Sequence, residues 1–132
     1  MHFSRLHHIA IICSNYEQSK HFYTNVLGFR ILHEQYRAER KSYKLDLRAG
    51  DVQIELFSFE HPPKRPSEPE ACGLRHIAFS VANIDEAVAH LQKHGVAVEP
   101  IRIDPITGKR FTFFRDPDDL PLELYETGSE YR

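Results

Sequence analysis

Two histidines and two glutamates recur at one fixed spacing in this chain. His8 lies in HHIAI and His76 in RHIAF, and 68 positions separate them. Glu55 lies in IELF and Glu123 in LELY, again 68 positions apart. Two imidazoles and two carboxylates that converge on one point form a divalent-metal site with room for a substrate. The spacing therefore predicts that these four residues are metal ligands supplied by a duplicated module.

Each of the four residues has a simpler interpretation when it is taken alone. A histidine in a strand is usually structural or exposed, and a glutamate in a strand is most often the polar half of an alternating pattern. The shared spacing changes this balance, because two unrelated core residues would rarely keep one offset. We therefore favour the metal site over the structural interpretation.

The elements that must position these residues repeat as well. The 132 residues suit a single domain, with one repeat at about 5–60, a proline-rich linker at 61–73 and a second repeat at about 74–126. Each repeat is predicted to be βαβββ. The expected strands are 6–13, 30–36, 42–48 and 52–59, then 74–81, 96–101, 111–115 and 122–126; the expected helices are 16–27 and 84–94.

The helix ends carry matching signals in both repeats. Asn15 and Asn83 are good N-caps, and each is followed three positions later by a glutamine or glutamate, as in a capping box. Gly28 and Gly95 lie where C-terminal caps belong. Side chains alternate across a strand, so Ile9 and Ile11 face away from His8. We expect the aliphatic face of each sheet to pack on its helix and the His–Glu face to line a concave surface.

Composition limits the classes of partner. The chain is 41% hydrophobic and 27% charged, with a formal net charge of −2 and no basic block. This argues against nucleic acid or an anionic membrane as the main partner. No apolar run is long enough to span a bilayer and the N-terminus has no signal-peptide pattern, so a cytoplasmic location is expected. Cys13 and Cys72 show no framework spacing and are expected to be free thiols.

The motifs also resemble a known family when they are taken together. HHIAI with FYTNVLGF, IELF, RHIAFSV and FRDPDDLPLELYE resemble the glyoxalase I and vicinal-oxygen-chelate superfamily, which includes bleomycin resistance proteins and dioxygenases. The similarity is closest to uncharacterised bacterial glyoxalase-like proteins of the YaeR type. The resemblance implies an α+β fold, in which two tandem βαβββ modules form a cupped mixed β-sheet with helices on the outer face. It also implies that His8, Glu55, His76 and Glu123 hold one divalent metal ion.

The resemblance implies a lyase or isomerase like lactoylglutathione lyase. Such an enzyme stabilises an enediolate by Lewis-acid chemistry while a carboxylate transfers a proton. Glu123 is the first candidate for the base, and Glu55 is the candidate if the roles are exchanged. Two imidazoles and two carboxylates suit zinc, nickel, cobalt, manganese or iron. The resemblance to short bacterial glyoxalase I chains favours nickel, cobalt or zinc among these.

Departures from the family pattern concern the substrate. Ile12 and Phe59 stand where bacterial glyoxalase I enzymes usually carry the arginine and asparagine that contact glutathione. A substrate other than the glutathione hemithioacetal is therefore open, although a small molecule with vicinal oxygens is expected. The candidates for substrate contact are Phe57, Phe59, Arg75, Arg110 and Tyr125.

Two other activities compete with the lyase. An extradiol dioxygenase normally uses two histidines and one glutamate on iron, so Glu55 would be a surplus ligand. A non-catalytic protein that binds small molecules such as antibiotics is the third interpretation, although such proteins commonly lack the metal residues. A homodimer is expected, and the metal could be held within one chain or shared between subunits.

Overall fold

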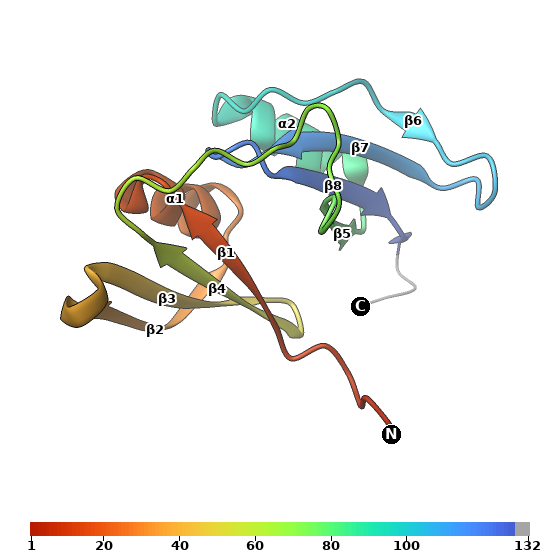
Figure 1. Cartoon of the computed structure of the whole chain (residues 1–132). Helices are drawn as coiled ribbons and strands as arrows, with labels where there is room; N and C mark the ends of the chain where they lie inside the picture. The colour runs from red at the N-terminus through yellow and green to blue at the C-terminus, as the bar shows by residue number, and fades with distance from the viewer. Residues whose placement is uncertain (129–132) are drawn as a thin grey trace. The chain divides into compact units, whose positions relative to one another are not determined.

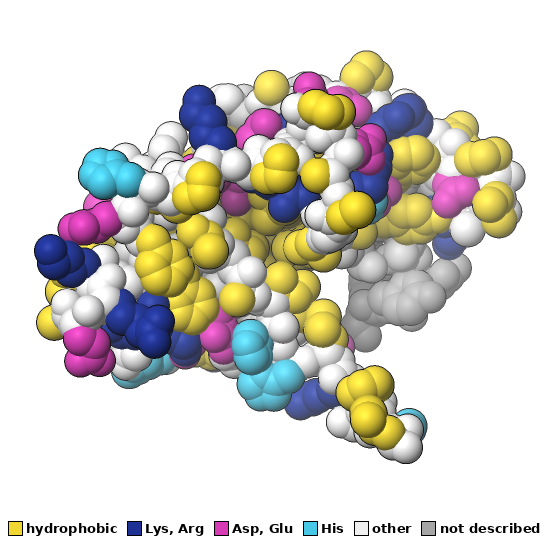
Figure 2. All heavy atoms as spheres, viewed as in Figure 1, with side chains coloured by type: hydrophobic (Ala, Val, Ile, Leu, Met, Phe, Trp, Pro, Cys, Tyr) yellow, Lys and Arg dark blue, Asp and Glu magenta, His cyan; other side chains and the backbone are white. Residues whose placement is uncertain are grey.

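The computed structural model describes residues 1–128, which form two compact units, Met1–Lys64 and Arg65 onward. Each unit contains one βαβββ repeat, so the predicted α+β class and its duplicated modules are confirmed (Figure 1). No helix in the described part of the chain is long and apolar enough to cross a membrane. Figure 2 shows acidic and basic side chains interspersed over the visible face.

The first unit is a four-stranded mixed sheet of order β1-β4-β3-β2, in which β1 and β4 are parallel and the other pairs are antiparallel. The helix packs on one side, where the rings of Tyr16 and Tyr43 stack 4.2 Å apart. Its elements are β1 (His8–Cys13), α1 (Tyr16–His21), a π-helical turn (Phe22–Val26), β2 (Arg30–Arg37), a 3₁₀ turn (Ala38–Arg40), β3 (Ser42–Ala49) and β4 (Val52–Ser58).

The second unit repeats this topology with the strand order β5-β8-β7-β6. Here β5 and β8 are parallel, and α2 packs beside β8 (Figure 1). Its elements are β5 (Ile77–Val81), α2 (Ile84–Lys93), β6 (Arg102–Ile103), β7 (Arg110–Arg115) and β8 (Pro121–Glu126).

Alternation divides each sheet into two faces, as the sequence predicts. In β1 the residues Ile11 and Cys13 are buried, whereas His8 and Ile12 are exposed. The buried face of each sheet packs on its own helix, and we call the other the helix-distal face. The fully buried aliphatic side chains of the helix side are Leu45, Leu47, Ile54 and Leu56 in the first unit and Ile84 and Leu122 in the second.

The two helices begin alike and end differently. Asn15 and Asn83 each accept a hydrogen bond at 3.1 Å from the backbone N–H three residues on, which confirms both predicted N-caps. In α2 the N–H groups of Gly95 and Val96 donate to carbonyls of the last turn, a Schellman ending with Gly95 at φ +77°.

The helix expected at 16–27 is present, but it is α-helical only as far as His21. After His21 the chain forms a π-helical turn, in which the N–H of Leu27 donates to the carbonyl of Phe22. The interval from Asn15 to Gly28 is one residue longer than that from Asn83 to Gly95. A π-turn accommodates one extra residue, so both helices still end at a glycine with positive φ.

The prediction of a strand at 96–101 is wrong. The ladder in this region holds the two residues Arg102 and Ile103, which pair with Phe111 and Arg110. The segment before them is linked to β7 by one hydrogen bond, from the N–H of Glu99 to the carbonyl of Phe113. Pro100 has no N–H and cannot donate the next hydrogen bond of a ladder. The other strand predictions differ from the structure by three residues or fewer at their ends.

Candidate metal-binding half-sites

The first unit brings its predicted histidine and glutamate together. His8 begins β1 and Glu55 lies in the middle of β4, where Ala10 is its register partner. Since Ala10 and His8 share a face, both predicted ligands lie on the helix-distal face. The Nδ1 atom of His8 is 3.7 Å from Oε2 of Glu55, and Glu55 is only 8% exposed.

The second unit repeats this arrangement with a closer contact. His76 directly precedes β5, and Glu123 lies in β8 with Ala78 as its register partner. The Nε2 atom of His76 is 3.0 Å from Oε1 of Glu123. The two His–Glu pairs therefore occupy the same step of two equivalent parallel strand pairs. We call them the first and second half-sites.

Charged and polar groups surround the first half-site. The side-chain amide of Gln53 donates to Glu55 at 2.9 Å, and Nζ of Lys44 lies 3.6 Å from the other carboxylate oxygen. Lys44 also pairs with Asp46 at 2.7 Å, and this hydrogen bond raises the pKa of Lys44. Glu55 is thus held in one orientation by its neighbours, as outer residues hold a metal ligand.

Aromatic side chains surround the second half-site. The rings of His76 and Phe113 meet edge to face at 5.0 Å, and the rings of Phe111 and Tyr125 stack at 6.4 Å. The backbone N–H of Ile106 and, second to it, the hydroxyl of Tyr125 donate hydrogen bonds to Asp104 and lower its pKa. The Tyr125 bond is 2.9 Å long. Tyr125 therefore ties this face to the 104–109 loop.

The distances fit two ligand atoms of one ion. Nitrogen and oxygen donors at about 2.1 Å from a divalent ion lie about 3.0 Å apart at a right angle and about 3.4 Å apart at the tetrahedral angle. The 3.0 Å separation in the second half-site lies in this range, whereas the 3.7 Å separation in the first is longer and would have to shorten on metal binding. Neutral imidazole and carboxylate are suitable donors, so the residues present fit a divalent metal.

Metal binding at His76 would require a change at its other ring nitrogen. Nη1 of Arg75 lies 3.0 Å from Nδ1 of His76. Arginine can only donate, so Nδ1 accepts and Nε2 carries the proton that faces Glu123. A metal at Nε2 needs the opposite tautomer, and the contact with Arg75 would then open.

Each unit by itself supplies two of the four predicted ligands. Within residues 1–128, no group of three or more His, Cys, Asp or Glu residues lies together as a metal-binding cluster. The four-ligand centre made of His8, Glu55, His76 and Glu123 therefore stays a prediction.

The predicted substrate residues fall into different environments. Phe57 and Phe59 stack at 6.4 Å, and the guanidinium of Arg37 lies 4.8 Å from the ring centre of Phe57. Arg110 is on the helix side, where it pairs with Glu126 and Asp85 at 2.9 Å. These contacts favour a structural role for Arg110 and leave Phe57, Phe59, Arg75 and Tyr125 as candidates for substrate contact.

Sequence reasoning named Arg75 and Tyr125 as candidates but assigned no role to Gln53, Lys44 or Phe113. Gln53 is two residues before Glu55 on the same face, so strand alternation could have found it. Arg65, Arg102 and Arg115 are distant in sequence from the ligands, but with Arg75 they line one hollow of the second unit. No sequence pattern marks that group.

Comparison with known proteins gives the class. The sequence model of the Glyoxalase/Bleomycin resistance protein/Dioxygenase superfamily matches residues 5–124, and the chain belongs to this superfamily. The chain is 63% identical to the uncharacterized protein YwkD of Bacillus subtilis and to the uncharacterized protein YaeR of Escherichia coli. In both comparisons the match covers 92% of this chain and 95% of the relative.

Solved structures agree with this assignment. The crystal structure of a glyoxalase family protein from Enterococcus faecalis is 51% identical, with a TM-score of 0.89 over 96% of this chain and 100% of that one. More distant relatives have named activities. A 2-epi-5-epi-valiolone epimerase of Actinomyces is 30% identical over 90% of this chain and 77% of its own length. A lactoylglutathione lyase of Salmonella typhimurium is 30% identical over 92% of each chain.

Proposed function

We propose that this protein is a divalent-metal-dependent lyase or isomerase of the glyoxalase I type. It would transfer a proton at a carbon beside a carbonyl group of a small substrate with vicinal oxygens. The observation that carries the proposal is the His–Glu contact that both repeats make at the same register step. The named activities of the distant relatives, a lyase and an epimerase, support this reaction class.

The four predicted ligands would divide the work. All four residues, His8, Glu55, His76 and Glu123, would hold the ion, with Glu55 fixed by Gln53 and Lys44. A bound divalent ion supplies Lewis-acid stabilisation of negative charge on a substrate oxygen. Glu123, whose side chain contacts His76, is the better candidate for the base, because a base must move between the site and the substrate carbon.

The substrate need not be the glutathione hemithioacetal. Ile12 is 55% exposed on the helix-distal face, where the family's arginine would contact glutathione. Phe59 packs against Phe57 in place of the family's asparagine. An apolar surface in place of a cation and an amide favours a different acyl or carbonyl compound. We also propose a homodimer, with the metal held within one chain or shared across its interface.

The experiment that tests the proposal is metal analysis of the purified full chain. The wild type is compared with His8→Ala, Glu55→Ala, His76→Ala and Glu123→Ala, and His21→Ala, an exposed histidine of α1, is the matched control. We expect near-stoichiometric nickel, cobalt or zinc in the wild type and the control. Loss of a residue that only orients a ligand weakens metal binding by about 10–100-fold, and loss of a ligand itself costs more. Each site variant should therefore bind metal at least about a hundredfold more weakly.

Turnover is then measured on the metal-loaded protein. Hemithioacetal isomerisation is followed by absorbance, and exchange of deuterium from solvent into α-hydroxy carbonyl compounds is followed by NMR. Stoichiometric iron with catechol ring cleavage would replace the proposal with a dioxygenase. Failure to bind any divalent metal after reconstitution would contradict the proposal and favour a non-catalytic protein that binds small molecules.

A further inference from the structure

The second unit contains a hollow that the metal ligands do not explain. Its volume is about 360 Å³, at the lower end of the range of small-molecule pockets. One wall is the helix-distal face of β7, where Phe113 and Arg115 lie. The opposite wall is the segment 65–75, which we call the strap.

Contacts within the unit fix the strap over the sheet. The hydroxyl of Ser67 donates to the carbonyl of Asp119 at 2.8 Å, in the turn between β7 and β8. Glu68 pairs with Arg115 at 2.7 Å. The guanidinium of Arg65 donates to the carbonyls of Leu74 and Arg75, which closes the strap on itself. The wall of the hollow is therefore built by specific contacts.

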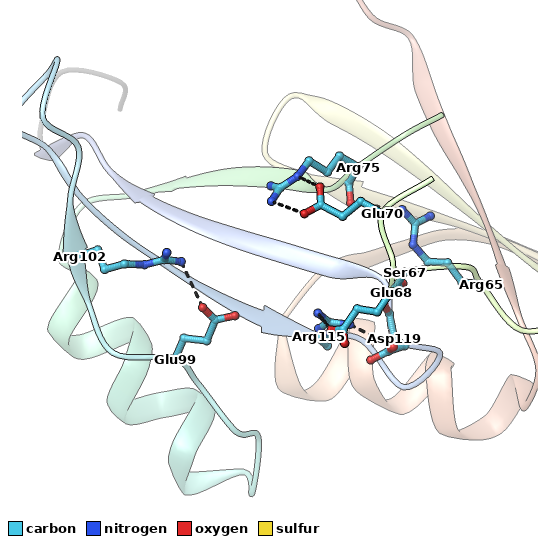
Figure 3. Close-up of polar contacts among 9 residues, drawn as sticks. All are labelled: Arg65, Ser67, Glu68, Glu70, Arg75, Glu99, Arg102, Arg115 and Asp119. Atoms are coloured by element: carbon cyan, nitrogen blue, oxygen red, sulfur yellow. Dashed lines mark hydrogen bonds and ion pairs between the residues drawn. The ribbon is translucent and has the colours of Figure 1, made fainter. Parts of the chain in front are cut away.

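Four guanidinium groups line this hollow, from Arg65, Arg75, Arg102 and Arg115, together with three carboxylates. Three of the arginines pair with those carboxylates: Arg75 with Glu70, Arg102 with Glu99 and Arg115 with Glu68 (Figure 3). Arg65 pairs with no carboxylate of residues 1–128, and its Nε is buried without a hydrogen-bond partner. Its positive charge is therefore uncompensated on the strap side of the hollow.

The three carboxylates are suited to exchange with a ligand. The side chains of Glu68, Glu70 and Glu99 are 75%, 64% and 50% exposed, and ion pairs this exposed add little stability. The guanidinium of Arg102 has a second support, since it lies 5.1 Å from the ring centre of Phe111 and 5.6 Å from that of Phe113. Arg115 has a second partner in Asp119 at 3.0 Å. Both arginines would stay in place if the glutamates were displaced.

Two residues that line the hollow also contact the second half-site. Phe113 lines the hollow, is the register partner of Glu123, and its ring contacts the His76 ring at 5.0 Å. Arg75 lines the hollow as well and contacts Nδ1 of His76. A small molecule with one end at the arginines would therefore extend along Phe113 toward His76 and Glu123.

We propose that this hollow binds an oxyanion, a carboxylate or phosphate group, at one end of the molecule whose other end reaches His76 and Glu123. This assignment rests on the function proposed above and specifies its substrate class as a small acid with an apolar middle. Planar guanidinium groups bind both oxyanions through paired hydrogen bonds, which lysine cannot reproduce.

The test uses the full chain, labelled with ¹⁵N and freed of metal by chelation. Inorganic phosphate, phenyl phosphate and benzoate are titrated at constant ionic strength, and the arginine side-chain N–H signals are followed by NMR. We expect saturable shifts for the hollow's arginines, with phenyl phosphate or benzoate binding more tightly than phosphate because of Phe113. The stronger of these two ligands identifies the oxyanion.

Variants then locate the binding site. Arg102→Gln and Arg115→Gln should each weaken binding about tenfold or more, because each removes charge-assisted hydrogen bonds. Glu99→Gln should tighten binding about twofold to fivefold by removing an exposed competing carboxylate, a gain that misfolding cannot produce. Arg48→Gln is the matched control, since Arg48 occupies in β3 the register step that Arg115 occupies in β7.

Three outcomes would overturn the assignment. These are unchanged affinity in Arg102→Gln, equal weakening in Arg48→Gln, and phosphate binding that requires metal. The metal content of the same arginine variants separates the two proposals. Loss of oxyanion binding with normal metal content would affect only the oxyanion site and not the metal centre. Oxyanion binding by a chain that binds no metal even after reconstitution would contradict the proposed metal-dependent enzyme and support the oxyanion site.

Discussion

The two half-sites have the same backbone and different neighbours. In each unit a parallel strand pair places an alanine beside the glutamate, Ala10 beside Glu55 and Ala78 beside Glu123. The antiparallel strand on the other side differs. Asp46 is the register partner of Glu55, whereas Phe113 is that of Glu123. Two residues away, Lys44 of the first unit stands where the second has Phe111.

This difference indicates how equivalent glutamates of two duplicated modules can have different roles, one as a metal ligand and one as a base. The strand register alone positions a His–Glu pair, so both copies keep it. The surrounding side chains then decide how the carboxylate is held. In the first unit they are Gln53 of the same strand and Lys44 of the neighbouring strand, and in the second unit they are aromatic rings. We therefore expect Glu55 to act as a fixed ligand and Glu123 as the reactive carboxylate.

The largest expected effect is on turnover. Glu123→Gln should lower kcat by about 10²–10⁴-fold, the usual contribution of a general base. Glu55→Gln should act mainly on metal affinity, and its turnover at saturating metal should fall less. Steady-state kinetics beside metal titrations checks both variants. If Glu55→Gln lost turnover and Glu123→Gln lost only metal, the two roles would be exchanged.

Core packing gives the next largest effect, and it also differs between the units. The first helical segment buries Tyr16, Ser19, Phe22, Tyr23 and Val26, whereas α2 buries only Ile84 and Leu91. Leu91→Ala should therefore lower the free energy of unfolding by about 3 kcal/mol. Urea unfolding measures this value. The neighbouring exposed Gln92→Ala should stay within about 0.5 kcal/mol of the wild type. A cost below about 1 kcal/mol for Leu91→Ala would show that α2 is not held by this contact.

A smaller effect is expected from the residue that orients Glu55. Gln53→Leu removes the amide that donates to Glu55, and the second unit has Pro121 at the equivalent register step. Metal affinity should fall about tenfold, as for other residues that orient a ligand. Competition with a chelating dye measures the affinity, and Gln92→Leu on α2 is the control. Unchanged affinity in Gln53→Leu would contradict a special role for the first half-site.

The smallest effect concerns the N-terminus of α2. Hydrogen bonds from Arg110, then from the backbone N–H of Ile84, hold the pKa of Glu126 below its ordinary value of 4.5. Because the folded-state pKa is lower, the stabilisation is present above about pH 4.5 and is lost as the pH falls through the folded-state pKa. Glu126→Gln should cost about 1 kcal/mol at neutral pH.

The pH dependence provides the control for this variant. Between pH 5 and pH 3 the free energy of unfolding of Glu126→Gln should decrease less steeply than that of the wild type, because one titrating carboxyl has been removed. Equal slopes in chemical unfolding experiments would show that Glu126 does not contribute to acid stability.

Much of the fold could be predicted because its signals are local. The caps at Asn15 and Asn83, the glycines that end the helices and the period-two strands all depend on residues a few positions apart. The prediction failed at 96–101, where an apolar pattern around Pro100 indicated a strand. The ladder there begins at Arg102, because pairing with β7 is a non-local choice. The π-turn was missed too, although the extra residue before Gly28 could have indicated it.

The sequence by itself determined the duplicated module, its α+β class and the identity of the two His–Glu pairs. It could do so because a repeat with strand alternation fixes which residues share a face. The tertiary structure decided which side chains surround each glutamate and that Arg65, Arg75, Arg102 and Arg115 meet around one hollow. These arginines belong to the strap, the start of β6 and the end of β7, so only long-range pairing and the anchoring of the strap bring them together.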